Sequence, residues 1–118
     1  MKNLILTLII IACFAGGAYA TTYQVGPTRP FPNLQAVAPI LAPGDIVEVD
    51  GNVTYPGDLI FTTPGTDANK ITIRGLRVNG IRPIISGGTN TVEFRLSDHY
   101  VFEGFDVTAG RLARRDGE

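Results

Sequence analysis

The sequence predicts an all-β protein in which parallel strands wind into a solenoid. From Asp45 onward, short runs rich in β-branched and aromatic residues alternate with turn residues, and helical periodicity is absent. One run also recurs at a fixed distance, because residues 71–78 (ITIRGLRV) match residues 100–107 (YVFEGFDV) with an offset of 29. Consecutive hairpins do not require such a repeat, whereas the stacked coils of a solenoid do.

Residues 1–20 have the pattern of a secretory signal peptide. A short basic start leads into an apolar run, and AYA at 18–20 supplies the small residues that precede cleavage. The run is shorter than the roughly 20 apolar residues of a membrane span. We therefore expect a secreted or cell-envelope protein without a membrane span. As an alternative, IIAC at 10–13 resembles a lipoprotein lipobox, which would make Cys13 an acylated first residue.

Composition narrows the function of the mature chain. Cys13 is the only cysteine, so disulfides cannot support the exported part, and packing and strand pairing must stabilise it. The formal net charge is −1, and no basic stripe with interleaved aromatic residues occurs. We therefore expect no nucleic-acid partner.

Residues 21–44 are expected to form a first strand followed by a short capping helix. The strand is predicted at 21–26, and the proline-rich segment 27–32 is irregular. Asn33 is a suitable N-cap, and Pro39 limits the helix to one or two turns. Its apolar positions at helical spacing are Leu34, Val37, Ala38 and Leu41.

Residues 45–110 are expected to form the coils of the solenoid. The predicted strands are 45–49, 59–63, 71–74, 82–86, 91–95 and 100–107. VNGI at 78–81 is the one place where a two-residue turn could join two strands as a hairpin.

The repeat predicts which residues stack on one another. In the strand starting at Ile71 the apolar phase slips by one residue at Gly75, so glycine is expected to mark a corner of each coil. VEVDG at 47–51 is a weaker third copy, 24 residues before the second. The expected columns are Gly51, Gly75 and Gly104 at a corner, Val49, Ile73 and Phe102 inside, Asp50, Arg74 and Glu103 outside, and Arg77 over Asp106.

Four segments together resemble the N-terminal coils of secreted right-handed parallel β-helix proteins of the pectate-lyase-like superfold. These segments are LQAVAPILAPGDIVEVDG (34–51), ITIRG (71–75), RPIISGG (82–88) and VEFRLSDHYVFEGFDVTAG (92–110). The superfold includes pectate, alginate and chondroitin lyases. The resemblance implies a right-handed parallel β-helix of about three coils, whose N-terminal helix caps the first coil. It specifies no activity, because this fold hosts many functions.

The last residues depart from that pattern. We expect residues 111–118 to form a charged irregular tail, because no strand pattern follows Gly110. This predicts a truncated chain whose last coil is open and could pair with further coils or another chain. The alternative is a genuine miniature whose exposed coil binds a partner.

Lyase chemistry is the sharpest enzymatic hypothesis. β-Elimination from a uronic acid needs a neutralised carboxylate, commonly through Ca²⁺, and a base that takes a carbon-bound proton. Outward acids are predicted at Glu48, Asp50, Glu93, Glu103 and Asp106, interleaved with Arg74, Arg77 and Arg95. Such alternation suits a structural ladder better than a Ca²⁺ cluster. We therefore assign no catalytic residue, no metal ligand and no cofactor, with Ca²⁺ expected only if the chain is a lyase.

Three further features stand alone in the sequence. Lys70 is the only lysine of the mature chain and follows a loop, and the Asp98–His99 pair is expected in a surface turn. NVT at 52–54 fits an N-glycosylation site, which matters only in a eukaryotic secretory route.

The sequence thus predicts an exported β-helix domain that belongs to a carbohydrate-active or polysaccharide-binding protein and is not catalytically complete. Arg74, Arg77 and Arg82 suggest an acidic polysaccharide as partner, although charge pairing should leave only Arg82 free. The substrate-binding residues are not specified. The alternatives are a Ca²⁺-assisted polysaccharide lyase and a non-functional truncated fragment.

Overall fold

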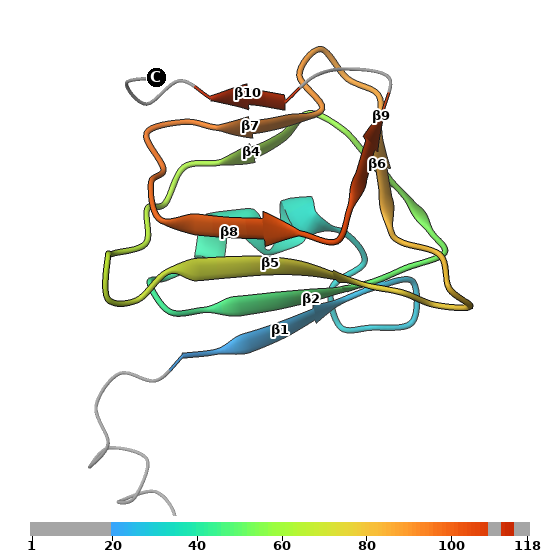
Figure 1. The fold of residues 1–118 in the computed structure, drawn as a ribbon, viewed down its shortest axis with the longest axis horizontal. Helices are drawn as coiled ribbons and strands as arrows, with labels where there is room; N and C mark the ends of the chain where they lie inside the picture. Colours follow the sequence, from blue (N-terminus) through green and yellow to red (C-terminus); the bar gives the residue numbers. More distant parts are fainter. Residues whose placement is uncertain (1–19, 109–111, 115–118) are drawn as a thin grey trace, which may run out of the picture.

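The computed structural model describes residues 20–108 and the backbone of 112–114. It shows a right-handed parallel β-helix of about three coils, which confirms the predicted fold class (Figure 1). The predicted signal peptide, including the alternative lipidation site at Cys13, lies outside the described residues apart from Ala20.

Each complete coil contributes one strand to each of three parallel sheets (Figure 1). The first sheet contains β1 (Thr22–Val25), β2 (Ile46–Asp50), β5 (Ile71–Leu76) and β8 (Tyr100–Glu103), in that order. The second contains β3 (Thr54–Pro56), β6 (Ile84–Ser86) and β9 (Asp106–Thr108). The third contains β4 (Leu59–Phe61), β7 (Val92–Phe94) and β10 (Leu112–Arg114). All seven strand pairs are parallel.

The predicted capping helix is present as two short 3₁₀ turns, η1 (Leu34–Ala36) and η2 (Ala38–Ile40), which pack against β4. The Asn33 side chain accepts a hydrogen bond from the Ala36 amide, so the predicted N-cap is confirmed. The side-chain amide of Gln35 donates to the carbonyl oxygens of Pro56 and Gly57. The turns therefore satisfy backbone acceptors at the edge of the first complete coil, which is what a cap must do.

The core is a continuous column of apolar side chains inside the coils. In the first sheet Val47 pairs with Ile73, and Ile73 pairs with Phe102; Val47 and Ile73 are fully buried. The aromatic rings of Phe61, Phe94, Tyr100, Phe102 and Phe105 stack at the C-terminal end of this column. Full burial of one large apolar side chain contributes about 1.5–3 kcal/mol, so this column supplies the main stability.

The register confirms one half of the sequence repeat and corrects the other. β8 pairs with β5 at the predicted offset of 29, from Ile71 opposite Tyr100 to Arg74 opposite Glu103. β5 pairs with β2 at an offset of 26 instead of 24, so Val47 occupies the inner position expected for Val49. The alignment at 24 matched the Asp-Gly ending of VEVDG, whereas the structure follows the two valines that the strand buries.

The expected glycine column holds for two of its three members. A methyl group added to Gly75 would overlap the carbonyl oxygen of Gly104, so these two glycines lie directly over one another. Gly51 does not join them, because it packs against the backbone of Leu76 and Ile81. The two-residue change of register carries Gly51 past the corner that Gly75 and Gly104 form.

Residues 77–83 form an insertion that the constant-offset alignment missed. The offset between coils falls from 29 in the first sheet to 22 in the second. The insertion contains the predicted VNGI turn: Val78 and Ile81 form an antiparallel bridge, and positive φ at Asn79 and Gly80 is typical of a type I′ turn. Arg77 consequently does not lie over Asp106 but donates to the carbonyl of Gly80.

Two further strands were not predicted. β3 lies between the predicted strands 45–49 and 59–63, and it has only three residues and ends in proline. β10 was interpreted as part of the irregular tail 111–118, yet Leu112–Arg114 pairs in parallel with Val92–Phe94. The prediction of an irregular tail is therefore wrong for these three residues.

The stacked glycines yield a stability prediction. Gly75→Ala places a methyl group against the Gly104 carbonyl and the Pro83 ring, and should lower the free energy of unfolding by about 2–3 kcal/mol. Gly80→Ala is the control, because nothing lies within 4 Å of the added methyl group and only the positive φ of 77° costs energy, about 1 kcal/mol. Urea unfolding followed by circular dichroism measures both losses. Equal losses would contradict the stacking.

Candidate functional site

A groove of about 220 Å³ crosses three successive turns of the chain at the corner between the first and second sheets. One wall comes from the loop after β1, the floor from the β2–β3 corner, and the far wall from the 78–81 hairpin. The lining residues are Pro27, Thr28, Asp50, Gly51, Asn52, Val53 and Val78. The groove therefore lies between the loop after β1 and the hairpin, with the β2–β3 corner beneath it.

An ion pair holds the first wall in place. The Arg29 guanidinium donates from Nε to Asp50 Oδ2 at 2.9 Å and from Nη1 to Gln24 Oε1 at 3.2 Å. The hydrogen bond to Asp50, followed by the charge of that carboxylate, raises the pKa of Arg29. The loop itself closes through the Gly26 amide, which donates to the Phe31 carbonyl at 2.9 Å. The Asp50 carboxylate therefore lines the groove as half of an ion pair.

The floor is fixed by backbone geometry and by one buried phenol. Asn52 has a φ of 58°, and its backbone N–H donates to the Ile81 carbonyl at 3.1 Å, which connects the floor to the hairpin. The Tyr55 hydroxyl donates to the Asp50 carbonyl at 2.7 Å. Burial, followed by the Asp50 charge, raises the pKa of Tyr55 to about 12. Hydrogen bonds from Asn52 and Tyr55 therefore hold the floor in place.

The groove combines two kinds of surface. Pro27, Val53 and Val78 offer apolar contact, whereas Thr28, Asp50 and Asn52 offer a hydroxyl, a carboxylate and an amide. This set can accept and donate hydrogen bonds to a neutral polar ligand while packing against its C–H groups.

The five predicted outward acids do not gather at one place. Glu48 lies opposite Arg74, and Arg74 contacts Glu103 at 3.2 Å, so the predicted column of alternating charge exists with Glu48 in the position expected for Asp50. The corrected register explains the exchange, and it leaves Asp50 to pair with Arg29.

The remaining two acids also have cationic partners. Asp106 contacts Arg82 at 3.5 Å, so the expectation that Arg82 is free is wrong. Glu93 is buried, with Arg95 Nε at 3.0 Å and Asn90 Nδ2 at 3.3 Å, and is not an exposed outward acid. Within residues 20–108, no three acidic, histidine or cysteine side chains cluster as metal ligands would. The described acids are therefore distributed over separate ion pairs.

The other singled-out residues lie away from the groove. Lys70 is exposed in the loop before β5, and His99 is exposed at the turn before β8 with a φ of 62°. The backbone carbonyl of His99 accepts a hydrogen bond from the Ile71 amide, so this turn carries the pairing of β8 with β5.

Comparison with known proteins leaves the chain without an assigned family. No family description matches it, and no curated protein matches it. The described residues include no long apolar helix of the kind that crosses a membrane.

The buried phenol under the groove predicts a pH dependence. A tyrosine whose pKa rises from about 10 when unfolded to about 12 when folded stabilises the fold below pH 10, and this stability is lost as pH rises toward 12. Tyr55→Phe should therefore make the alkaline fall in the free energy of unfolding less steep. At pH 7 it should cost about 1 kcal/mol through the lost hydrogen bond. Urea titrations between pH 7 and pH 12 test this, and an unchanged alkaline slope would refute it.

Proposed function

We propose that this chain is an exported, non-catalytic β-helix module that binds a polysaccharide along the corner groove. One observation carries the proposal: the groove runs across three successive turns of the solenoid with polar and apolar groups on its walls. Export is proposed on the signal-peptide pattern of residues 1–20.

The shape of the groove favours a polymer. A ligand in the groove contacts Thr28 on one wall, Asp50 and Asn52 on the floor, and Val78 on the other wall. Because the groove is open to solvent above its floor, a segment of a longer chain can lie in it while the rest of that chain extends beyond it.

The chemistry of the walls favours a saccharide. Sugar rings present C–H faces that pack on apolar side chains and hydroxyl groups that need both donors and acceptors. Pro27 and Val53 provide the first surface, and the Asp50 carboxylate and Asn52 amide provide the second. Because Arg29 neutralises Asp50, the groove does not repel an acidic chain.

The charge of the polysaccharide follows from which arginines are available. Arg74 and Arg82 already contact Glu103 and Asp106, so neither contributes an unpaired positive charge. An acidic polysaccharide remains the proposed partner only if binding weakens with added salt, as ionic contacts do. Binding that is independent of salt would assign a neutral polysaccharide to the same groove.

Conservative substitutions in the groove test the proposal. Asn52→Gly removes the amide without backbone strain, because glycine tolerates a φ of 58°, and Thr28→Val removes one hydroxyl at nearly constant shape. Each should weaken binding to a retained polysaccharide about five- to tenfold, as lost hydrogen bonds do. Affinity electrophoresis against neutral and uronic-acid polysaccharides measures this.

The matched control is Asn79→Gly, the same change at another residue with positive φ whose side chain is not among those lining the groove. It should leave binding unchanged. Binding that all three variants retain, or the absence of binding to every polysaccharide, would refute the proposal. An ultraviolet-absorbing unsaturated product would instead identify a lyase and contradict the non-catalytic assignment.

A further inference from the structure

The outer edge of β8 is a strand edge that no described residue covers. The first sheet ends at β8, whose only partner within residues 20–108 and 112–114 is β5 (Figure 1). At the opposite end of the solenoid, the turns at 34–40 and the Gln35 side chain cover part of the edge of the first complete coil.

Hydrogen bonding identifies the backbone groups that the β8 edge presents. Ile71 donates to His99 on one side of β5, and Thr72 donates to Asp45 on the other, both at 3.0 Å. Alternate residues of a parallel strand bond to alternate neighbours. The N–H and C=O groups of Tyr100 and Phe102 consequently point away from β5 and are positioned to pair with an added strand.

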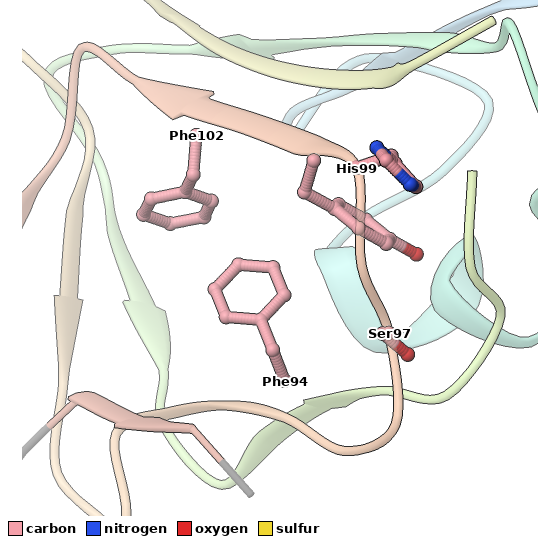
Figure 2. A pocket seen from close by; sticks show the side chains of 5 residues that line it. Phe94, Ser97, His99 and Phe102 are labelled. Atoms are coloured by element: carbon pink, nitrogen blue, oxygen red, sulfur yellow. The ribbon is translucent and has the colours of Figure 1, made fainter. Parts of the chain in front are cut away.

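The inner side of this edge is an open aromatic surface. Figure 2 shows Phe94 and Phe102 next to one another, with Ser97 and His99 at one side. These side chains and Tyr100 line a pocket of about 140 Å³. Inward side chains of an added strand would lie over Tyr100 and Phe102, as Ile71 and Ile73 do on the other side of β8.

The face of β8 that points away from the core carries a charge, and this charge favours a particular side chain on an added strand. Glu48, Arg74 and Glu103 alternate in sign along one column of the first sheet. Glu103 ends this column, and half of its side chain is exposed (52%). Opposite charges on neighbouring strands attract, so a basic side chain is the complementary continuation.

We propose that the β8 edge binds an extended peptide segment of another polypeptide, which adds to the first sheet as a parallel strand. The segment has the pattern apolar, any, apolar, basic, in register with Tyr100, Val101, Phe102 and Glu103. The main chain supplies affinity, and the alternate side chains supply specificity. β5 itself carries this pattern, because Ile71–Arg74 reads ITIR and pairs with the opposite edge of β8 in the same register.

A second copy of this chain is a poorer occupant. The other edge of the first sheet is β1, whose sequence from Thr22 to Val25 contains no basic residue. Two β8 edges also bring no cation to Glu103, because β8 reads YVFE. Charge complementarity therefore favours a different polypeptide.

The test uses the full chain and a synthetic peptide with the sequence of β5, Ile-Thr-Ile-Arg-Gly-Leu. The labelled peptide should bind with a dissociation constant below ~1 mM, measured by fluorescence anisotropy. N-methylation of its threonine blocks an N–H that faces β8 and should abolish binding. N-methylation of its second isoleucine blocks an N–H that faces solvent and is the matched control, which should bind normally.

Charge exchange tests the register. Glu103→Arg should weaken binding of the arginine peptide about fivefold and strengthen binding of the same peptide with glutamate in place of arginine. The affinity of Glu103→Gln for each peptide should lie between the affinities of the unmodified protein and of Glu103→Arg. This neutral variant also keeps the comparison valid if the Arg74 contact is necessary for folding.

The proposal is overturned if neither peptide binds, if both N-methylated peptides bind alike, or if exchanging the Glu103 charge has no effect. Sedimentation of the chain as a dimer that the peptide does not dissociate would also overturn it, because a second copy would then occupy the edge.

Discussion

The in-register parallel ladder of the first sheet is the constraint on which the rest of the structure depends. Val47, Ile73 and Phe102 share one inner column only in the observed register. A shift by one residue would turn this column to solvent and forfeit about 1.5–3 kcal/mol for each large side chain. The outer column of alternating charge follows from the same register. Its exposed ion pairs contribute little energy, so they complement a register that burial has already fixed.

The sequence predicted the fold because its two determinants are local. Alternating apolar residues define the strands, and the match of Ile71–Arg74 with Tyr100–Glu103 defines the winding. It mispredicted the pairing of β2, because the alignment matched Gly51 to Gly75, whereas the structure pairs Val47 with Ile73. The insertion at 77–83 was missed for a related reason: a constant offset cannot reveal a hairpin that lengthens one coil alone. Strands of three residues, such as β3 and β10, carry too little pattern to be distinguished from turns.

The candidate site was beyond sequence analysis because no single segment contains it. Thr28, Asn52 and Val78 come together only after the coils are stacked and the hairpin is placed. The sequence predicts Asp50 in the outer charge column. Its partner Arg29 lies in segment 27–32, whose prolines predict an irregular loop but no ion pair. The available signals were the asparagine-containing turns at 52 and 79, since asparagine tolerates positive φ, but these indicate turns in general and not a groove.

The two proposed interactions use different parts of the solenoid. The groove is built by turns between residues 27 and 78, and the cap at 34–40 belongs to that same part of the chain. The β8 edge lies at the other end, where the outward backbone groups of Tyr100 and Phe102 have no strand partner among the described residues. A strand added to β8 extends the first sheet along the solenoid axis and displaces none of the groove-lining residues. Peptide and polysaccharide therefore do not compete for the same residues.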